Sequence, residues 1–307
     1  MTHDPLTLAE YQRRSRQTDH FPQPDDEGHD PLLGPLLGLA GEVGTLLAAY
    51  KKRLRDGAAY ELFQDNVAEE LGDILWYLAN AAEKAGLSLD EVAERNLAKT
   101  SDRWPVQDGH SPTNRRPSEQ FDADLPEQHQ LPRTFEVTIR PVPDDGPEPM
   151  IEVIWKNRRV ASRLGDNTYG DSGYRYHDAF HLANAAVLGW SPVARGQIFG
   201  RKRPKGTMAD AVEDGGRAIV VEEAFAAFMF EYARQHNDLQ DVRHLDYNAL
   251  RTFRIFTAGL EVAQRHLSEV EEAVFQGFAA WRELRANDGG VLQGDLAARK
   301  LTYEPLA

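Results

Sequence analysis

The first hundred residues of the chain carry apolar residues at the three- and four-residue spacing of amphipathic helices. This spacing predicts helices over residues 6–18, from about residue 32 or 35 to about residue 55, over 64–85 and over 88–103. Gly57 and Gly86 are placed to end the second and third helices, because glycine adopts the left-handed conformation that commonly closes a helix. The pattern therefore predicts an N-terminal four-helix bundle over residues 1–105.

The pattern changes after the fourth helix. Residues 106–132 are polar and contain several prolines, which predicts a linker to a second domain over residues 133–307. Residues 135–142 and 150–160 alternate with period two and predict a β-hairpin. Helical periodicity returns at residues 174–188, 217–236, 245–267 and 268–287, and the Gly-rich stretch 199–216 is interpreted as a surface loop. The fold class predicted is mainly α, with a mostly helical C-terminal domain that includes one small β-hairpin.

Composition narrows the class of protein. The chain has 307 residues, of which 41% are apolar and 27% charged, as in soluble globular proteins, and we find no apolar run long enough to suggest a membrane partner. It has no cysteine and no apolar signal-peptide core, which favours a cytoplasmic location. The formal charge of -14 argues against a nucleic-acid partner, because phosphate backbones attract basic surfaces.

In two predicted helices the acidic residues lie beside the apolar stripe. On a helical projection, Glu42 lies at one edge of the stripe of the second helix, with Thr45 further round. Glu70 and Asp73 take the same two positions on the third helix, whereas Glu69 points away from the stripe. Two antiparallel helices packed along their stripes could bring these edges together.

Three carboxylates meeting at a half-buried seam would repel one another, and a divalent cation is the simplest relief. With oxygen ligands only, the cation expected at Glu42, Glu70 and Asp73 is Mg²⁺, or Mn²⁺, in preference to Zn²⁺. The alternative is that these three residues are ordinary boundary acids of amphipathic helices.

Three segments of this region, GLAGEVGTL, EELGDILWYLA and GLSLDEVAERNLAKTSDRW, closely resemble the MazG-like, all-α nucleoside triphosphate pyrophosphohydrolases, and LTLAEYQRRSRQT is similar to their first helix. The resemblance covers about residues 6–104. It implies Mg²⁺-dependent cleavage of a nucleoside triphosphate into a monophosphate and pyrophosphate. Glu42 matches the first acid of the family's ExxE motif, and Glu70 with Asp73 matches its ExxD motif, so the resemblance gives these residues catalytic and metal-binding roles.

The second acid of ExxE is Thr45 in this chain, and a threonine cannot supply a negative charge. Three interpretations follow: an enzyme that uses one metal ion, an enzyme that takes a carboxylate from elsewhere, or a nucleotide-binding sensor or regulatory protein with a degraded site.

The resemblance also implies substrate-binding residues and a homodimer or homotetramer. Asn96, Lys99 and Arg103 match the last-helix pattern that faces the nucleotide in relatives. Lys51 and Lys52 are further candidates for contacting the departing pyrophosphate, although basic residues at a helix C-terminus also stabilise the helix dipole.

The C-terminal half resembles an uncharacterised domain found behind MazG-like domains, through YRYHDAFHLANAAVLGWSP and DGGRAIVVEEAFAAFMFEYA. His177 and His181 have the i,i+4 spacing that can bind a metal or a phosphate, with Asp178 between them. Glu222 and Glu223 lie among apolar residues of a later helix, so at least one of them is expected to be buried and to need a partner.

These five residues could form a second polar site, which could itself be catalytic, for example in a metal-dependent phosphohydrolase. Alternatively, one acid orients a core histidine, or an arginine such as Arg175 or Arg217 pairs with it.

Overall fold

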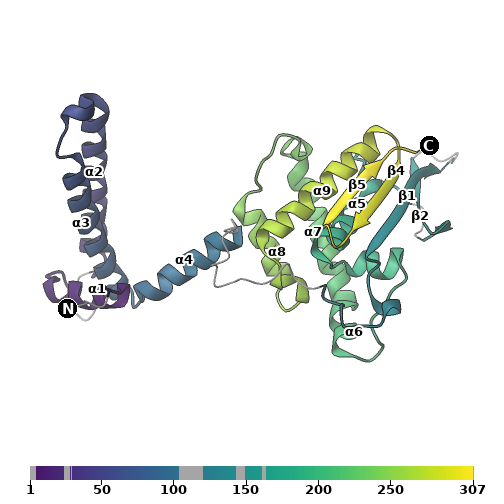
Figure 1. The fold of residues 1–307 in the computed structure, drawn as a ribbon, viewed down its shortest axis with the longest axis horizontal. Helices are drawn as coiled ribbons and strands as arrows, with labels where there is room; N and C mark the ends of the chain where they lie inside the picture. Colours follow the sequence, from purple (N-terminus) through teal and green to yellow (C-terminus); the bar gives the residue numbers. More distant parts are fainter. Residues whose placement is uncertain are drawn as a thin grey trace. The chain divides into compact units, whose positions relative to one another are not determined.

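The protein divides into two compact units, Met1–Ser101 and Asp102–Ala307, in a computed structural model (Figure 1). The structure describes residues 5–23, 28, 30–103, 120–142, 149–160 and 164–306. Residues 106–119 of the predicted linker and the centre of the hairpin turn, residues 143–148, lie outside these ranges.

The four helices predicted for the first unit are confirmed. They are α1 (Leu8–Ser15), extended by a 3₁₀ turn (Arg16–Thr18), α2 (Leu33–Asp56), followed by a 3₁₀ turn (Gly57–Ala59), α3 (Phe63–Lys84) and α4 (Leu89–Arg103). Helices α2 and α3 run side by side as a hairpin, and α1 packs on α3 (Figure 1). Gly57, with φ of 60°, ends α2 as predicted.

Polar side chains join α1 to the end of α3. The Gln12 side chain donates to Leu87 O (2.9 Å) and accepts from Leu89 N (2.8 Å), so it ties the turn between α3 and α4 to α1. Lys84 pairs with Asp19 at 2.6 Å, and both side chains are buried.

Trp76 belongs to this packing as well. On a helical projection Trp76 lies nearly opposite the apolar stripe of α3. In the structure it is half-buried, its Nε1 donates to Thr18 Oγ1 (2.8 Å), and its ring lies 6.3 Å from that of Phe21. The segment after α1 therefore returns across α3 and partly covers this side of the helix.

Helix α2 approaches α3 closely at Gly38. A Cβ atom at Gly38 would lie 2.1 Å from the Tyr77 ring, whereas a Cβ at Gly44 would meet no described atom within 4 Å. We expect Gly38→Ala to lower the free energy of unfolding by about 1–3 kcal/mol, because the ring must move to accept the methyl group. Gly44→Ala is the matched control and should leave stability unchanged or raise it by up to about 1 kcal/mol. Urea denaturation of both variants checks this, and equal midpoints would contradict it.

Much of the apolar surface of the hairpin is not covered by its own unit. On α2, Leu47 is 63% exposed and Leu54 71%, and on α3 Leu71 is 51% exposed. By length and composition, the segment Leu33–Ala59 could also cross a membrane, a weak indication that core helices of soluble proteins share.

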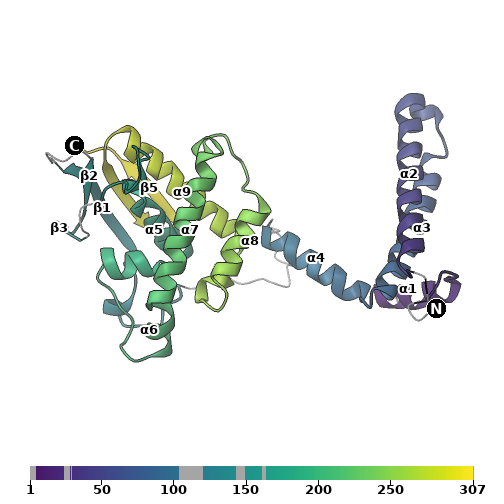
Figure 2. The ribbon, with the colours of Figure 1, turned by 180° about the vertical axis from the view of Figure 1, so that it is seen from behind.

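The second unit contains a five-stranded antiparallel sheet in the order β3-β2-β1-β4-β5; Figure 1 labels β4 and Figure 2 labels β3. The strands are β1 (Thr134–Val142), β2 (Met150–Trp155), β3 (Arg158–Arg159), β4 (Gly290–Asp295) and β5 (Lys300–Glu304). The predicted hairpin is present as β1 and β2, with Ile139 opposite Val153. The second hairpin, β4–β5, was not predicted, and it extends the sheet on the other side of β1.

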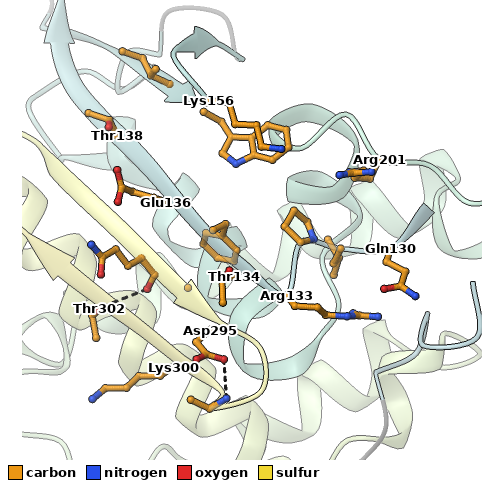
Figure 3. Close-up of a pocket in the computed structure, with 18 of the residues that line it drawn as sticks. Gln130, Arg133, Thr134, Glu136, Thr138, Lys156, Arg201, Asp295, Lys300 and Thr302 are labelled. Carbon is orange, nitrogen blue, oxygen red and sulfur yellow. Dashed lines mark hydrogen bonds between the residues drawn. The ribbon is translucent and has the colours of Figure 1, made fainter. Parts of the chain in front are cut away.

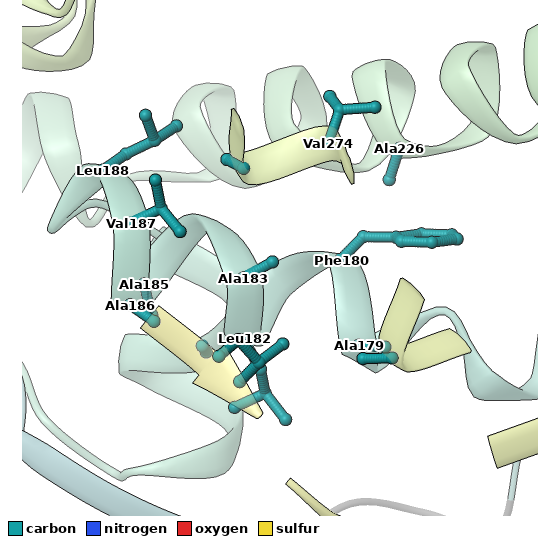
Figure 4. Close-up of a cluster of buried hydrophobic side chains, with 14 of the residues drawn as sticks. Ala179, Phe180, Leu182, Ala183, Ala185, Ala186, Val187, Leu188, Ala226 and Val274 are labelled. Carbon is teal, nitrogen blue, oxygen red and sulfur yellow. The ribbon is translucent and has the colours of Figure 1, made fainter. Parts of the chain in front are cut away.

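Helices cover one face of this sheet. They include α5 (Asp178–Ala183), continued by a π-helix (Asn184–Leu188), and α9 (Leu267–Ala286). Strand β1 alternates from Thr134 to Ile139, so that Phe135, Val137 and Ile139 are buried while Thr134 and Glu136 are exposed. Figure 4 shows the centre of this core, where Phe180 and Ala183 of α5 lie near Ala226 and Val274.

The rest of the unit consists of helices and short turns. They are 3₁₀ turns at Glu127–His129, Tyr174–Tyr176, Asn237–Leu239 and Glu261–Gln264, a π-helix at Ala194–Ile198, and helices α6 (Met208–Glu213), α7 (Gly216–Arg234) and α8 (Tyr247–Phe256). The helix predicted over 245–267 is therefore wrong in its second half. It stops after Phe256, and Gly259 has φ of 84°, which does not continue a helix.

Two polar segments are fixed in the second unit by ion pairs between buried side chains. Asp122, within the predicted linker, accepts hydrogen bonds from Leu131 N (2.7 Å) and Arg133 (2.7 Å) and pairs with Arg195. In the stretch 199–216, many residues are exposed as predicted for a surface loop, but α6 forms within it and Arg203 is 4% exposed and pairs with Asp214. The polar composition indicated a linker and a loop, but the buried charged residues of these segments form ion pairs with residues elsewhere in the chain.

Candidate functional site

Glu42 of α2 and Glu70 of α3 lie close together, although the apolar stripes that were expected to pack against each other remain largely exposed. Glu42 and Glu70 are both half-buried. The pKa of Glu70 is raised, first by burial and then by Glu42, whose carboxyl group is close enough to share a hydrogen bond with it; Glu69 and Asp73 add smaller repulsions. The predicted pairing of one acid from each helix is thus present in the first unit.

One oxygen of this pair lacks a partner. Glu70 Oε2 is inaccessible to solvent and has no hydrogen bond among the described residues. An orphaned carboxylate oxygen beside a second carboxylate fits a hard divalent cation, which would relieve both the repulsion and the missing bond. Asp73 is exposed and close enough to Tyr11 of α1 to help burial raise the pKa of that phenol.

Thr45 offers nothing equivalent to the missing acid. Its side chain is exposed, and its hydroxyl donates to Gly41 O of its own helix (3.3 Å). Lys51 and Lys52, two turns further along α2, are also exposed.

The predicted nucleotide-facing residues of α4 fall in both units. Asn96 and Lys99 are exposed residues of the first unit. Arg103 belongs to the second unit, where it donates to Leu245 O (3.4 Å) and its guanidinium lies 5.6 Å from the Tyr247 ring centre.

A second cluster forms in the C-terminal unit between α5 and α7. His181 is fully buried, with Nδ1 3.1 Å from Glu222 Oε1 and Nε2 3.4 Å from Glu223 Oε2. Burial lowers the pKa of His181, but the two carboxylates outweigh it and raise the pKa to about 10. The histidine and both glutamates singled out in the sequence are therefore brought together.

His177 completes the cluster from the start of α5. Its Nδ1 lies 2.9 Å from Tyr174 O, and its Nε2 lies 3.9 Å from Asp178 Oδ1. The arginines that were the alternative partners bond elsewhere, Arg175 to Asp166 and Arg217 to Ala258 O.

The solvent face of the sheet carries a polar hollow of about 1090 Å³ that sequence reasoning missed (Figure 3). Thr134, Glu136 and Thr138 of β1 lie along it, with Arg133 and Lys300 at its sides. The exposed polar residues of β1 could have indicated this face of the sheet. The strands β4 and β5, which widen the face, were not predicted. The hollow shares no lining residue with either acidic cluster.

Comparison with known families decides what this two-unit chain is. The MazG C-terminal domain matches residues 116–307, and the MazG nucleotide pyrophosphohydrolase domain matches residues 35–107. The chain belongs to the MazG family. Both domains suspected from the sequence motifs are confirmed, as is the mainly α fold.

A phage protein is similar to part of the chain. The Gene 37 protein of Mycobacterium phage L5 is 34% identical over 96 residues, which is 30% of this chain and 84% of the phage protein. Its name states no activity. No solved structure matches the chain.

Proposed function

We propose that this MazG-family protein is a Mg²⁺-dependent nucleoside triphosphate pyrophosphohydrolase that releases pyrophosphate and a nucleoside monophosphate. The single observation that carries the proposal is the Glu42–Glu70 pair, with an orphaned oxygen on Glu70, inside a MazG nucleotide pyrophosphohydrolase domain. Both side chains come from long helices, which hold them in a fixed relation.

Glu42 and Glu70 would hold the ion, with Asp73 one turn further along α3 as the third oxygen ligand. Bound Mg²⁺ would neutralise the triphosphate and lower the pKa of the attacking water. Lys51, Lys52, Asn96 and Lys99 are the exposed candidates for contacts with the nucleotide. The predicted contact of Arg103 with the nucleotide stays a prediction.

Incubation of the purified chain with a panel of nucleoside and deoxynucleoside triphosphates, with Mg²⁺ or Mn²⁺, tests this proposal. Pyrophosphate release that depends on the added metal supports it. Measurable nucleotide binding without release from any substrate would sink it.

The second candidate is a nucleotide-binding sensor or regulatory protein, and the position of Thr45 favours it. Because threonine replaces the second acid of ExxE, the site has one acid fewer than the ExxE and ExxD motifs would supply. The Thr45 hydroxyl donates to Gly41 O of its own helix. If this interpretation holds, the unmodified chain binds nucleotides. Thr45→Glu should then raise the rate of pyrophosphate release. An unchanged rate in Thr45→Glu would count against a degraded site.

We further propose that the α2–α3 hairpin is covered by a second copy of the chain. Its exposed leucines, among them Leu47 and Leu54, form the kind of apolar surface that a soluble monomer rarely presents. Light scattering should give a dimer or tetramer, and Leu47→Lys should shift it towards the monomer. A monomeric unmodified chain at micromolar concentration would contradict this assembly.

A further inference from the structure

The His177–His181–Glu223 cluster has the properties of a metal site, independently of the pyrophosphohydrolase site. Among the described residues it is the one group of three potential ligands whose donor atoms all lie within 4.8 Å of one another. The two histidines are one turn apart at the start of α5, and the glutamate comes from α7, which packs on α5. The donors therefore converge from two helices that the core holds in place.

The spacing inside the cluster suits coordination better than hydrogen bonding. His181 Nε2 and Glu223 Oε2 are 3.4 Å apart, which is long for a hydrogen bond, although the His181 side chain is fully buried. Two ligands about 2.0–2.2 Å from a tetrahedral ion lie about 3.4 Å from each other. An ion between these atoms would satisfy the buried nitrogen.

In both histidines the neighbouring oxygen atom lies beside Nδ1, which leaves Nε2 available to bind an ion. Tyr174 O lies 2.9 Å from His177 Nδ1, and Glu222 Oε1 lies 3.1 Å from His181 Nδ1. Glu222 is itself fixed, because it accepts from Asn184 (3.1 Å) and from Val193 N (3.0 Å). A carbonyl or a carboxylate behind each imidazole is the usual outer shell of a metal-bound histidine.

We propose that His177 Nε2, His181 Nε2 and the Glu223 carboxylate bind a divalent transition metal of the zinc class, with a fourth position open to water. Two histidines and one carboxylate are the ligand set of catalytic zinc sites. The Glu223 side chain is 37% exposed and that of His177 15%, so the ion can enter from solvent. Asp178 lies next to His177, where a carboxylate can hydrogen-bond to a metal-bound water. The alternative is a metal-free cluster in which a protonated His181 pairs with both glutamates.

The test measures zinc bound by the full chain. The protein is stripped with a chelator, dialysed against excess Mg²⁺ to occupy the N-terminal carboxylates, loaded with Zn²⁺ and assayed for metal by mass spectrometry and titration calorimetry. We expect His177→Ala and Glu223→Gln each to bind one zinc fewer per chain, or to bind it at least about 100-fold more weakly, because even outer partners of a metal change affinity by about 10–100-fold.

Glu231→Gln is the matched control, since this acid lies on the same helix with a side chain that is 62% exposed, and it should bind zinc like the unmodified chain. Cobalt provides a readout that needs no variant: Co²⁺ should give visible absorption bands that one equivalent of Zn²⁺ removes. The proposal is overturned if the unmodified chain binds no zinc and gives no cobalt bands. It is equally overturned if His177→Ala and Glu223→Gln bind zinc as tightly as the unmodified chain does.

Discussion

Replacing Glu70 by glutamine is expected to lower the rate of pyrophosphate release at least about 100-fold. The substitution keeps the size of the side chain but removes the charge that a divalent cation needs. Since Glu42 and Glu70 face the same place from two helices, Glu42→Gln should cause a loss of similar size. Steady-state rates at several Mg²⁺ concentrations check this, and part of the lost rate should return at high Mg²⁺.

Glu69 provides the control, because it precedes Glu70 on α3 and is exposed. Glu69→Gln removes the same charge from the same turn but should keep nearly the full rate. If Glu69→Gln and Glu70→Gln were equally active, the loss of rate could not be assigned to a metal held between α2 and α3.

Arg195 is the position where we expect the largest loss of stability. Its side chain is 2% exposed, pairs with the buried Asp122 and donates to His129 O (2.7 Å). Burial acts to raise the pKa of Asp122, but its bonds to Leu131 N and Arg195 outweigh burial and lower the pKa, so this carboxylate is charged in the folded state. Arg195→Met would leave that charge buried without its main partner, and should lower the free energy of unfolding of the C-terminal unit by about 3–5 kcal/mol.

Urea denaturation followed by tryptophan fluorescence measures this, because Trp190 and Trp281, two of the five tryptophans, are buried in the second unit. Arg234→Met is the matched control, because Arg234 forms an exposed pair with Glu231 at 3.0 Å and such pairs contribute less than about 1 kcal/mol. Similar unfolding midpoints for Arg195→Met and Arg234→Met would show that the buried pair does not stabilise the unit.

The sequence predicted the elements whose signal is local. Helical periodicity placed α1 to α4 and α9 to within a few residues, and period-two alternation found β1 and β2. Projection also separated Glu70 from Glu69, because a difference of one residue turns a side chain by about 100°. The β4–β5 hairpin was not predicted because its strands are short. Two glycines in β4, Gly290 and Gly294, also interrupt the alternation of apolar and polar residues.

What could not be predicted depends on partners that are distant in the chain. Asp122 is separated from its partner Arg195 by 73 residues, and Arg203 from its partner Glu261 by 58. These ion pairs fix segments whose polar composition is typical of a linker and a loop. The approach of His181 to Glu222 and Glu223 was a guess from spacing and burial, since nothing local sets the distance between α5 and α7. The contacts of Trp76 with Phe21 and Thr18 could not be predicted for the same reason, because these residues reach it from another element.

We propose that the Glu42–Glu70 pair supports cleavage between the α and β phosphates of a nucleoside triphosphate. Phosphorus NMR identifies the products formed by the full chain with Mg²⁺ and each of several triphosphates. We expect a monophosphate and pyrophosphate in equal amounts from at least one triphosphate, and neither product with Glu70→Gln. A diphosphate with free phosphate, or no product from any triphosphate, would contradict it.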